Sequence, residues 1–215
     1  MTARPPLTRE RIVDAAAAVA DRLGLEGVSM RSVGRELGAE AMSLYHHIAG
    51  KESLLDDLAD WVFARIDLVD SQEPWRDALA LRASSMRVVL AAHPWSLRLV
   101  DARRASGPAQ LRHQDAVLGC LFGAGFPTDL AVHAVSATDS YVYGFVLTEL
   151  NLPFKPGESA EELVADLELP LAEFPHLARM VADMVVGRDF RFADEFSYGL
   201  DLILDGLAER LRDRR

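Results

Sequence analysis

The chain has 215 residues, of which half are apolar and 26% are charged, so its composition is that of a globular protein and excludes a disordered or collagen-like chain. Its single cysteine, Cys120, excludes an internal disulfide. No apolar run approaches the length of about 18 residues that a membrane span needs, and residues 1–7 lack the apolar segment of a secretion signal. These features predict a cytoplasmic protein without a membrane partner.

The net charge of −10 argues against a nucleic-acid partner, but the charge is unevenly distributed. Residues 1–51 carry seven Lys or Arg and six Asp or Glu, whereas residues 52–215 carry sixteen and twenty-seven. A near-neutral head on an acidic body is typical of a two-part protein whose head contacts phosphate. The same imbalance also arises by chance, so charge does not decide the question.

Helix signals cover the N-terminal third. The expected helices span residues 8–23, 29–37, about 40–47 and about 51–69. Thr8 and Ser29 are typical N-caps, and apolar side chains recur every three or four positions behind them. Gly38 and Gly50 stop the second and third helices.

In the remainder of the chain, prolines lie at or beside the first residues of apolar-periodic segments. The expected helices span residues 74–92, 94–104, 108–124, 127–151, 160–168, 175–186 and 193–213. Residues 153–159 form the clearest loop. Ala and Leu, with 31 residues each, favour helix, and no segment alternates in the manner of a strand. The predicted fold class is therefore all-α.

The two short helices and their glycine turn, flanked by longer helices, predict a helix-turn-helix embedded in a bundle. In such a motif the second short helix enters the major groove of DNA while its neighbours support it and contact phosphates.

Several stretches of this region resemble the TetR family of bacterial repressors: residues 12–16 (IVDAA), 27–33 (GVSMRSV), 36–39 (ELGA) and 43–55 (SLYHHIAGKESLL). The match runs over about fifty residues without a gap. Its Leu-Tyr-x-His-x-x-x-Lys-x-x-Leu portion is specific because it links two helices and a turn.

The resemblance implies a homodimeric repressor that binds double-stranded, palindromic operator DNA and is released by a small-molecule effector. It also implies a three-helix DNA-binding domain over residues 1–52 and a C-terminal helical bundle over residues 53–215 for ligand binding and dimerisation.

The family pattern assigns DNA contacts to eight positions: Arg31, Glu40, Ala41, Met42, Ser43, Tyr45, His47 and Lys51. Arg31 is the candidate for a bidentate contact to guanine, with an ion pair to Glu36 as the alternative. Tyr45 and Lys51 are expected on phosphates, with ordinary surface roles as the alternative. A cation at a helix N-terminus is disfavoured by about 0.3–1 kcal/mol. A bound anion would offset this cost, so a phosphate contact is the favoured interpretation of Lys51.

The C-terminal part resembles the tetracycline-repressor-like C-terminal domain only loosely, through residues 139–145 (DSYVYGF). The helices over 127–151 and 193–213 are candidates for a four-helix interface between two copies, with packing inside one subunit as the alternative. The candidate interface residues are Val135, Val142, Val146, Phe196, Leu200, Ile203, Leu204 and Leu207.

An effector cavity is expected between the middle helices, for an unknown small and largely apolar molecule. Its candidate residues are polar or aromatic positions on otherwise apolar faces: Met86, Trp95, His113, Thr138, Tyr141 and Phe145. Each of them alternatively belongs to the ordinary core. The histidines are too dispersed for a metal set, and no cofactor is expected.

No catalytic or phosphate-loop motif is present in the sequence. Two alternatives remain beside the ligand-released repressor. One is a DNA-binding activator or ligand-independent regulator, and the other is a helical-bundle enzyme acting through His113 and neighbouring acids.

Overall fold

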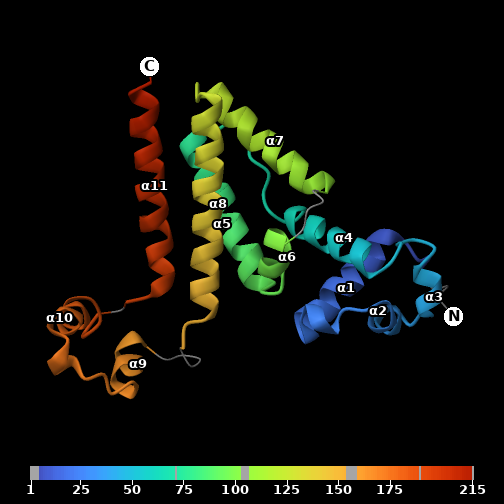
Figure 1. The fold of residues 1–215 in the computed structure, drawn as a ribbon, viewed down its shortest axis with the longest axis horizontal. Coiled ribbons are helices and arrows are strands. Elements are labelled where there is room, and N and C mark those ends of the chain that lie inside the picture. The colour runs from blue at the N-terminus through green and yellow to red at the C-terminus, as the bar shows by residue number, and fades with distance from the viewer. Residues whose placement is uncertain (1–4, 71, 103–106, 154–158, 189, 215) are drawn as a thin grey trace.

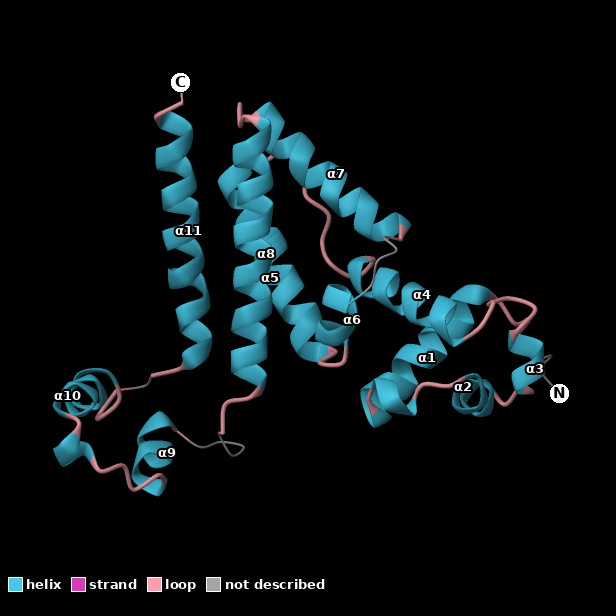
Figure 2. Cartoon of the chain, in the orientation of Figure 1, coloured by secondary structure: helices cyan, strands magenta, loops and turns pink. Residues whose placement is uncertain are grey.

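The computed structural model describes residues 5–70, 72–102, 107–153, 159–188 and 190–214, without the side chains of residues 100–102. Over these residues the chain contains helices and no strand, which confirms the predicted all-α class (Figure 2). The helices are α1 (Arg9–Leu23), α2 (Met30–Leu37), α3 (Ala41–Leu44), α4 (Lys51–Phe63), α5 (Trp75–Ala92), α6 (Ser96–Ala102), α7 (Pro108–Gly123), α8 (Thr128–Leu150), α9 (Ala160–Asp166), α10 (Pro175–Met184) and α11 (Glu195–Arg212).

The helices form a head, a body and a small lobe (Figure 1). Helices α1 to α3 make up the head, and α4 leads from it into the body of α5 to α8 and α11. Helix α11 packs along α8, and both lie at the side of the body away from the head. Among the described residues, the lobe of α9 and α10 has a separate core of three buried residues, Ala160, Val181 and Val185.

Two predicted helices are shorter than expected. The helix predicted over about 40–47 is the single turn α3, because the N–H of His47 donates to the carbonyl of Leu44, three residues back, and closes a tighter turn. The helix predicted to reach residue 69 ends at Phe63, where Ile66 N–H likewise donates to the Phe63 carbonyl. Residues 103–104 and 154–158 of the predicted elements lie outside the described residues.

Helix α4 belongs to the cores of both head and body. Leu54 is fully buried with head residues such as Ile12 and Leu44, and Leu58 and Val62 are equally buried further along the helix. One continuous cluster of apolar side chains therefore connects the two parts of the molecule.

Two polar contacts reinforce that connection. The Asp60 carboxylate on α4 accepts hydrogen bonds from the backbone N–H groups of Ala109 (2.7 Å) and Gln110 (3.1 Å), in the first turn of α7. A Cβ at Gly107 would lie 2.3 Å from that carboxylate, so this approach requires glycine. On α1, Asp21 accepts from the Trp95 indole at 2.6 Å, just before α6. Helices α1 and α4 are thus tied to the body by separate contacts.

A buried histidine lies beside the same junction. His113 on α7 is 4% exposed, and its pKa is lowered, first by burial and then by the charge of Arg82. A hydrogen bond to the backbone of Phe63, at the end of α4, opposes that shift. The imidazole is therefore held neutral in the folded protein at neutral pH.

Asp60→Ala should lower the free energy of unfolding by about 0.5–2 kcal/mol, because two N–H groups at the start of α7 lose their acceptor. Urea unfolding followed by circular dichroism measures the change. Asp115→Ala, which removes an exposed carboxylate from the middle of α7, is the control and should stay within about 0.5 kcal/mol of the wild type. Equal losses in the two variants would contradict the capping role of Asp60.

The lowered pKa of His113 also predicts a pH dependence of stability. As the pH falls, the unfolded chain binds a proton at this residue near the ordinary histidine pKa of about 6.5, before the folded chain does. The contribution of neutral His113 is therefore complete above about pH 6.5 and is lost as the pH falls below it. Urea midpoints between pH 8 and pH 5 should decline less steeply in His113→Leu than in the wild type. The exposed-site variant His176→Leu should decline like the wild type.

Candidate DNA-binding and effector sites

The helix-turn-helix geometry is fixed by side-chain caps and two glycines. Ser29 caps α2 by accepting from the Ser32 N–H at 3.1 Å, while the Ser32 hydroxyl accepts from the Ser29 N–H at 2.9 Å. Gly38 ends α2 in the left-handed region at a φ of 57°. A Cβ at Gly34 would lie 2.9 Å from the Ala39 carbonyl oxygen, so glycine permits the close approach of α2 to the turn. Together these contacts set the angle between α2 and α3.

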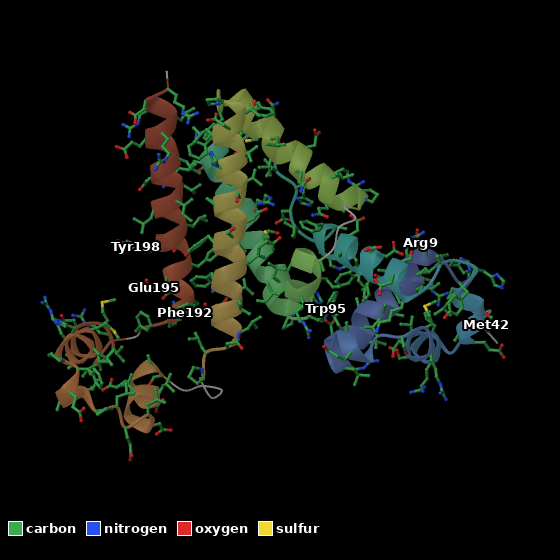
Figure 3. The ribbon with its side chains drawn as sticks, viewed as in Figure 1. Arg9, Met42, Trp95, Phe192, Glu195 and Tyr198 are labelled. Atoms are coloured by element: carbon green, nitrogen blue, oxygen red, sulfur yellow. The ribbon has the colours of Figure 1, made fainter. Side chains whose placement is uncertain are left out.

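The apolar side of this unit faces the head core and its polar side faces solvent. Leu44 and Ile48 are buried, whereas Met42 is 71% and Tyr45 48% exposed, and Met42 lies at the far tip of the head (Figure 3). The other predicted DNA contacts on α3 and nearby are Glu40 and His47, which are exposed, and Ala41 and Ser43, which are half-buried.

The two predicted cationic contacts are both exposed. Lys51 is the first residue of α4, and Arg31 is the second residue of α2. Glu36, the alternative partner of Arg31, forms its ion pair with Arg22 of α1. Arg31 forms no ion pair within the described part of the chain. Its guanidinium is therefore available to a partner outside the protein.

The six predicted effector residues fall into three separate places. Met86, His113 and Thr138 are buried between α5, α7 and α8. Trp95 belongs to the junction with α1, through its hydrogen bond to Asp21. The structure therefore brings together only half of the predicted set in the interior of the body.

Tyr141 and Phe145 lie instead in an aromatic cluster between α8 and α11. The Tyr141 hydroxyl donates to the backbone carbonyl of Phe196 at 2.9 Å, and the ring of Phe145 stacks on that of Phe192, with centroids 4.7 Å apart. Phe192 lies just before α11, beside the lower end of α8 (Figure 3). Arg87 on α5 places its guanidinium 4.9 Å from the Phe145 ring. A groove of about 400 Å³ adjoins the cluster, lined by Ser84, Arg87, Val88, Ala91, Glu149 and Phe196.

Sequence reasoning missed the most unusual buried group of the body, Arg82. This residue is 4% exposed and forms an ion pair with Asp139 of α8 at 2.5 Å. Its position within the apolar stripe of α5, one turn from Leu79 and Met86, is the signal that identifies it. Three buried side-chain atoms have no hydrogen-bond partner within the described residues: Arg82 Nε, Ser96 Oγ and His113 Nδ1.

Most of the predicted interface residues pack inside their own subunit. Six of them are buried in the single chain, namely Val142, Val146, Phe196, Leu200, Leu204 and Leu207, and the other two, Val135 and Ile203, are half-buried. The reason is that α8 and α11 each turn one apolar stripe toward the body. The exposed apolar side chains of these helices are different ones, among them Leu147, Tyr198 and Leu202.

Among the described residues, no group of three or more His, Cys, Asp or Glu side chains is arranged to hold a metal ion. Within the same ranges, no helix is long and apolar enough to cross a membrane.

Comparisons with known proteins agree with this architecture. Residues 12–58 match the family of bacterial regulatory proteins of the tetR type, and residues 70–211 match the tetracyclin repressor-like C-terminal domain. The chain is 34% identical to the HTH-type transcriptional repressor DrrR1 of Streptomyces coeruleorubidus, over 99% of this chain and 81% of that protein. It is 29% identical to the class C tetracycline repressor of Escherichia coli, over 96% of this chain and 92% of that one.

Solved structures give the same result. Apo ActR from Streptomyces coelicolor superimposes with a TM-score of 0.80 at 25% identity, covering 99% of this chain and all of that one. ActR in complex with actinorhodin gives a TM-score of 0.77 at 25% identity, covering 96% of this chain and 99% of that one. The family match over the body alone spans more than half of the chain. The helix-turn-helix head, the helical body and these matches together show that the chain belongs to the TetR family of transcriptional regulators.

Proposed function

We propose that this protein is a homodimeric, cytoplasmic repressor that binds a palindromic operator and leaves it when a small, largely apolar effector binds. The observation that carries the proposal is the double connection of the head to the body, through Asp60 on α4 and Asp21 on α1. A head tied at two points follows any rearrangement of the body, which is what an effector-controlled DNA-binding protein requires.

The DNA contacts follow from the exposed side of the head. Lys51 is the first residue of α4, whose N-cap Gly50 supplies no side-chain cap, and its ammonium together with the positive end of the helix dipole suits a backbone phosphate. The exposed Tyr45 hydroxyl would donate to a neighbouring phosphate. Ala41 and Met42 offer no side-chain hydrogen bonds, so they sense thymine methyl groups or exclude other bases. Base discrimination then depends mainly on Arg31.

Control by the effector is proposed as a population shift. The repressor samples body arrangements that place its two heads at different separations, and only one separation matches successive major grooves of the operator. An effector that binds a mismatched arrangement more tightly lowers operator affinity by that difference. The solved complex of ActR with actinorhodin supports ligand binding by this chain as well. No enzymatic step is part of this proposal.

Dimerisation is proposed through the outward faces of α8 and α11. Tyr198 and Leu202, one turn apart on α11, are 66% and 60% exposed, and Leu147 of α8 is 55% exposed. Large apolar side chains gathered on a long helix pair are typical of a partner surface. A two-fold axis through this surface also provides the two heads that a palindrome requires.

Arg31→Ala and Lys51→Ala should weaken DNA binding in different ways. Loss of Arg31 should flatten the base preference at one symmetric pair of operator positions, since a bidentate arginine–guanine contact contributes about 1–3 kcal/mol of discrimination. Loss of Lys51 should weaken binding to all duplexes alike and lower the salt slope by about one per half-site. Binding profiles on a randomised operator at several salt concentrations measure both effects.

Arg188→Ala, which removes an exposed positive charge in the lobe far from the head, is the control and should change neither profile nor salt slope. A uniform loss of affinity in Arg31→Ala would rule out its base-reading role. A changed base preference in Lys51→Ala, at an unchanged salt slope, would rule out its phosphate contact.

Leu202→Glu should give folded monomers that no longer bind the operator, because it places a charge in the proposed apolar interface. Sedimentation velocity and far-UV circular dichroism measure assembly and folding. Leu81→Glu on α5, where the leucine is 62% exposed, is the matched control and should remain dimeric. A dimer of Leu202→Glu that still binds operator DNA would contradict this interface.

A further inference from the structure

The interior of the body contains an ion pair and a neutral histidine from three different helices. Arg82 of α5 pairs with Asp139 of α8, and His113 of α7 lies close enough to both for their charges to affect its pKa. Arg82 and His113 are each 4% exposed. The residues one turn away on the three helices, Met86, Val117 and Val142, are all buried and apolar.

Two nitrogen atoms of this cluster have no hydrogen-bond partner within the described residues. Both terminal NH₂ groups of Arg82 bind the Asp139 carboxylate, which leaves the Nε–H as an unused donor. His113 donates one ring N–H to the Phe63 backbone, and its unpartnered ring nitrogen is Nδ1. In the neutral imidazole this Nδ1 is a hydrogen-bond acceptor.

Unused polar atoms at this depth are uncommon, because folded proteins pair nearly all of their buried donors and acceptors. A ligand that supplies the two missing partners accounts for both atoms at once. The charges within the cluster also limit the charge that this ligand can carry. Asp139 already neutralises Arg82 and His113 is uncharged, so a buried carboxylate would gain no net opposite charge to offset its lost hydration.

We propose that Arg82 and His113 form the polar end of the effector site, and that the effector is uncharged and presents an acceptor to Arg82 Nε and a donor to His113 Nδ1. Lactams and secondary amides carry both groups, a carbonyl acceptor and an N–H donor. The inference rests on the proposed function and adds the chemical class of the effector to it. Met86 is the side chain that makes room, since its flexible, unbranched chain repacks readily.

His113 also provides a short connection between the proposed effector site and the helix that leads to the head. The ring of His113 is hydrogen-bonded to the end of α4 at Phe63, and α7 itself begins on the Asp60 carboxylate of α4. A ligand that binds Nδ1 therefore acts on a side chain whose other nitrogen already contacts α4. No intermediate element is needed between ligand recognition and the helix that leads to the DNA-binding head.

The test uses the full-length protein and a compound library in four equal classes: uncharged lactams and amides, their N-methyl analogues, carboxylates and amines. Binding is measured by the shift in melting temperature, and release by fluorescence anisotropy of a labelled operator. Compounds that bind and release should come from the lactam and amide class. Their N-methyl analogues, which lack the donor, should bind about tenfold more weakly or worse.

Three variants locate the site. His113→Leu should weaken binding of the active compounds about tenfold, as should Arg82→Met combined with Asp139→Leu, which avoids leaving the Asp139 carboxylate without its ion-pair partner. Arg112→Met, next to His113 but exposed, should bind them like the wild type. Melting temperatures and operator binding without compound establish that each variant is folded. If the double variant does not fold, His113→Leu decides the test.

A readout at the residue itself separates ligand contact from a structural role. The ¹⁵N resonance of His113 Nδ1, identified by its absence in His113→Leu, should move toward the hydrogen-bonded position when an active compound is added. Active compounds that are carboxylates, that bind His113→Leu undiminished, or that leave this resonance unmoved would overturn the proposed site while leaving the ligand-released repressor intact. Failure of every class to release the operator would overturn that function, and the site with it.

Discussion

Helix α4 is the element on which the rest of the structure depends, because one run of thirteen residues packs in two cores at once. Its first half closes the head behind α1, and its second half is buried in the body. Burial of this kind is not directional and permits small rotations. The hydrogen bonds to the Asp60 carboxylate are directional, and they fix the start of α7 at a defined position along α4.

The sequence predicted those parts of the fold that depend on local chemistry. Thr8 and Ser29 cap their helices as expected, and Gly38 ends α2 in the left-handed conformation that glycine favours. The ends of α3 and α4 were predicted several residues too late. Nothing in the sequence around Phe63 or Tyr45 marks the change from four-residue to three-residue hydrogen bonding that ends α4 and α3. That change depends on how the following segment packs.

Periodicity identified the apolar stripes of α8 and α11 but not their partners. A stripe such as Leu200, Leu204 and Leu207 looks the same in the sequence whether it packs in its own subunit or against a second copy. Periodicity likewise did not show the partners of the aromatic positions on apolar faces: the Trp95 indole donates to Asp21, and the Tyr141 hydroxyl donates to the Phe196 carbonyl. Arg82, which the sequence analysis missed, was within reach of the same method, because a charged residue inside the apolar stripe of α5 needs a partner in the core. An unpaired buried donor costs about 1–3 kcal/mol, so such residues are rarely kept without a role.

The lobe of α9 and α10 has a consequence for how the molecule fluctuates. Its described core contains three buried apolar residues, while Phe174, Met180 and Met184 expose large parts of their side chains. So small a core contributes little to local stability, and the lobe opens at a lower free energy than the surrounding helices. Cleavage by a protease at low concentration should therefore begin in this lobe, and the head and the α8–α11 pair should remain folded as resistant fragments.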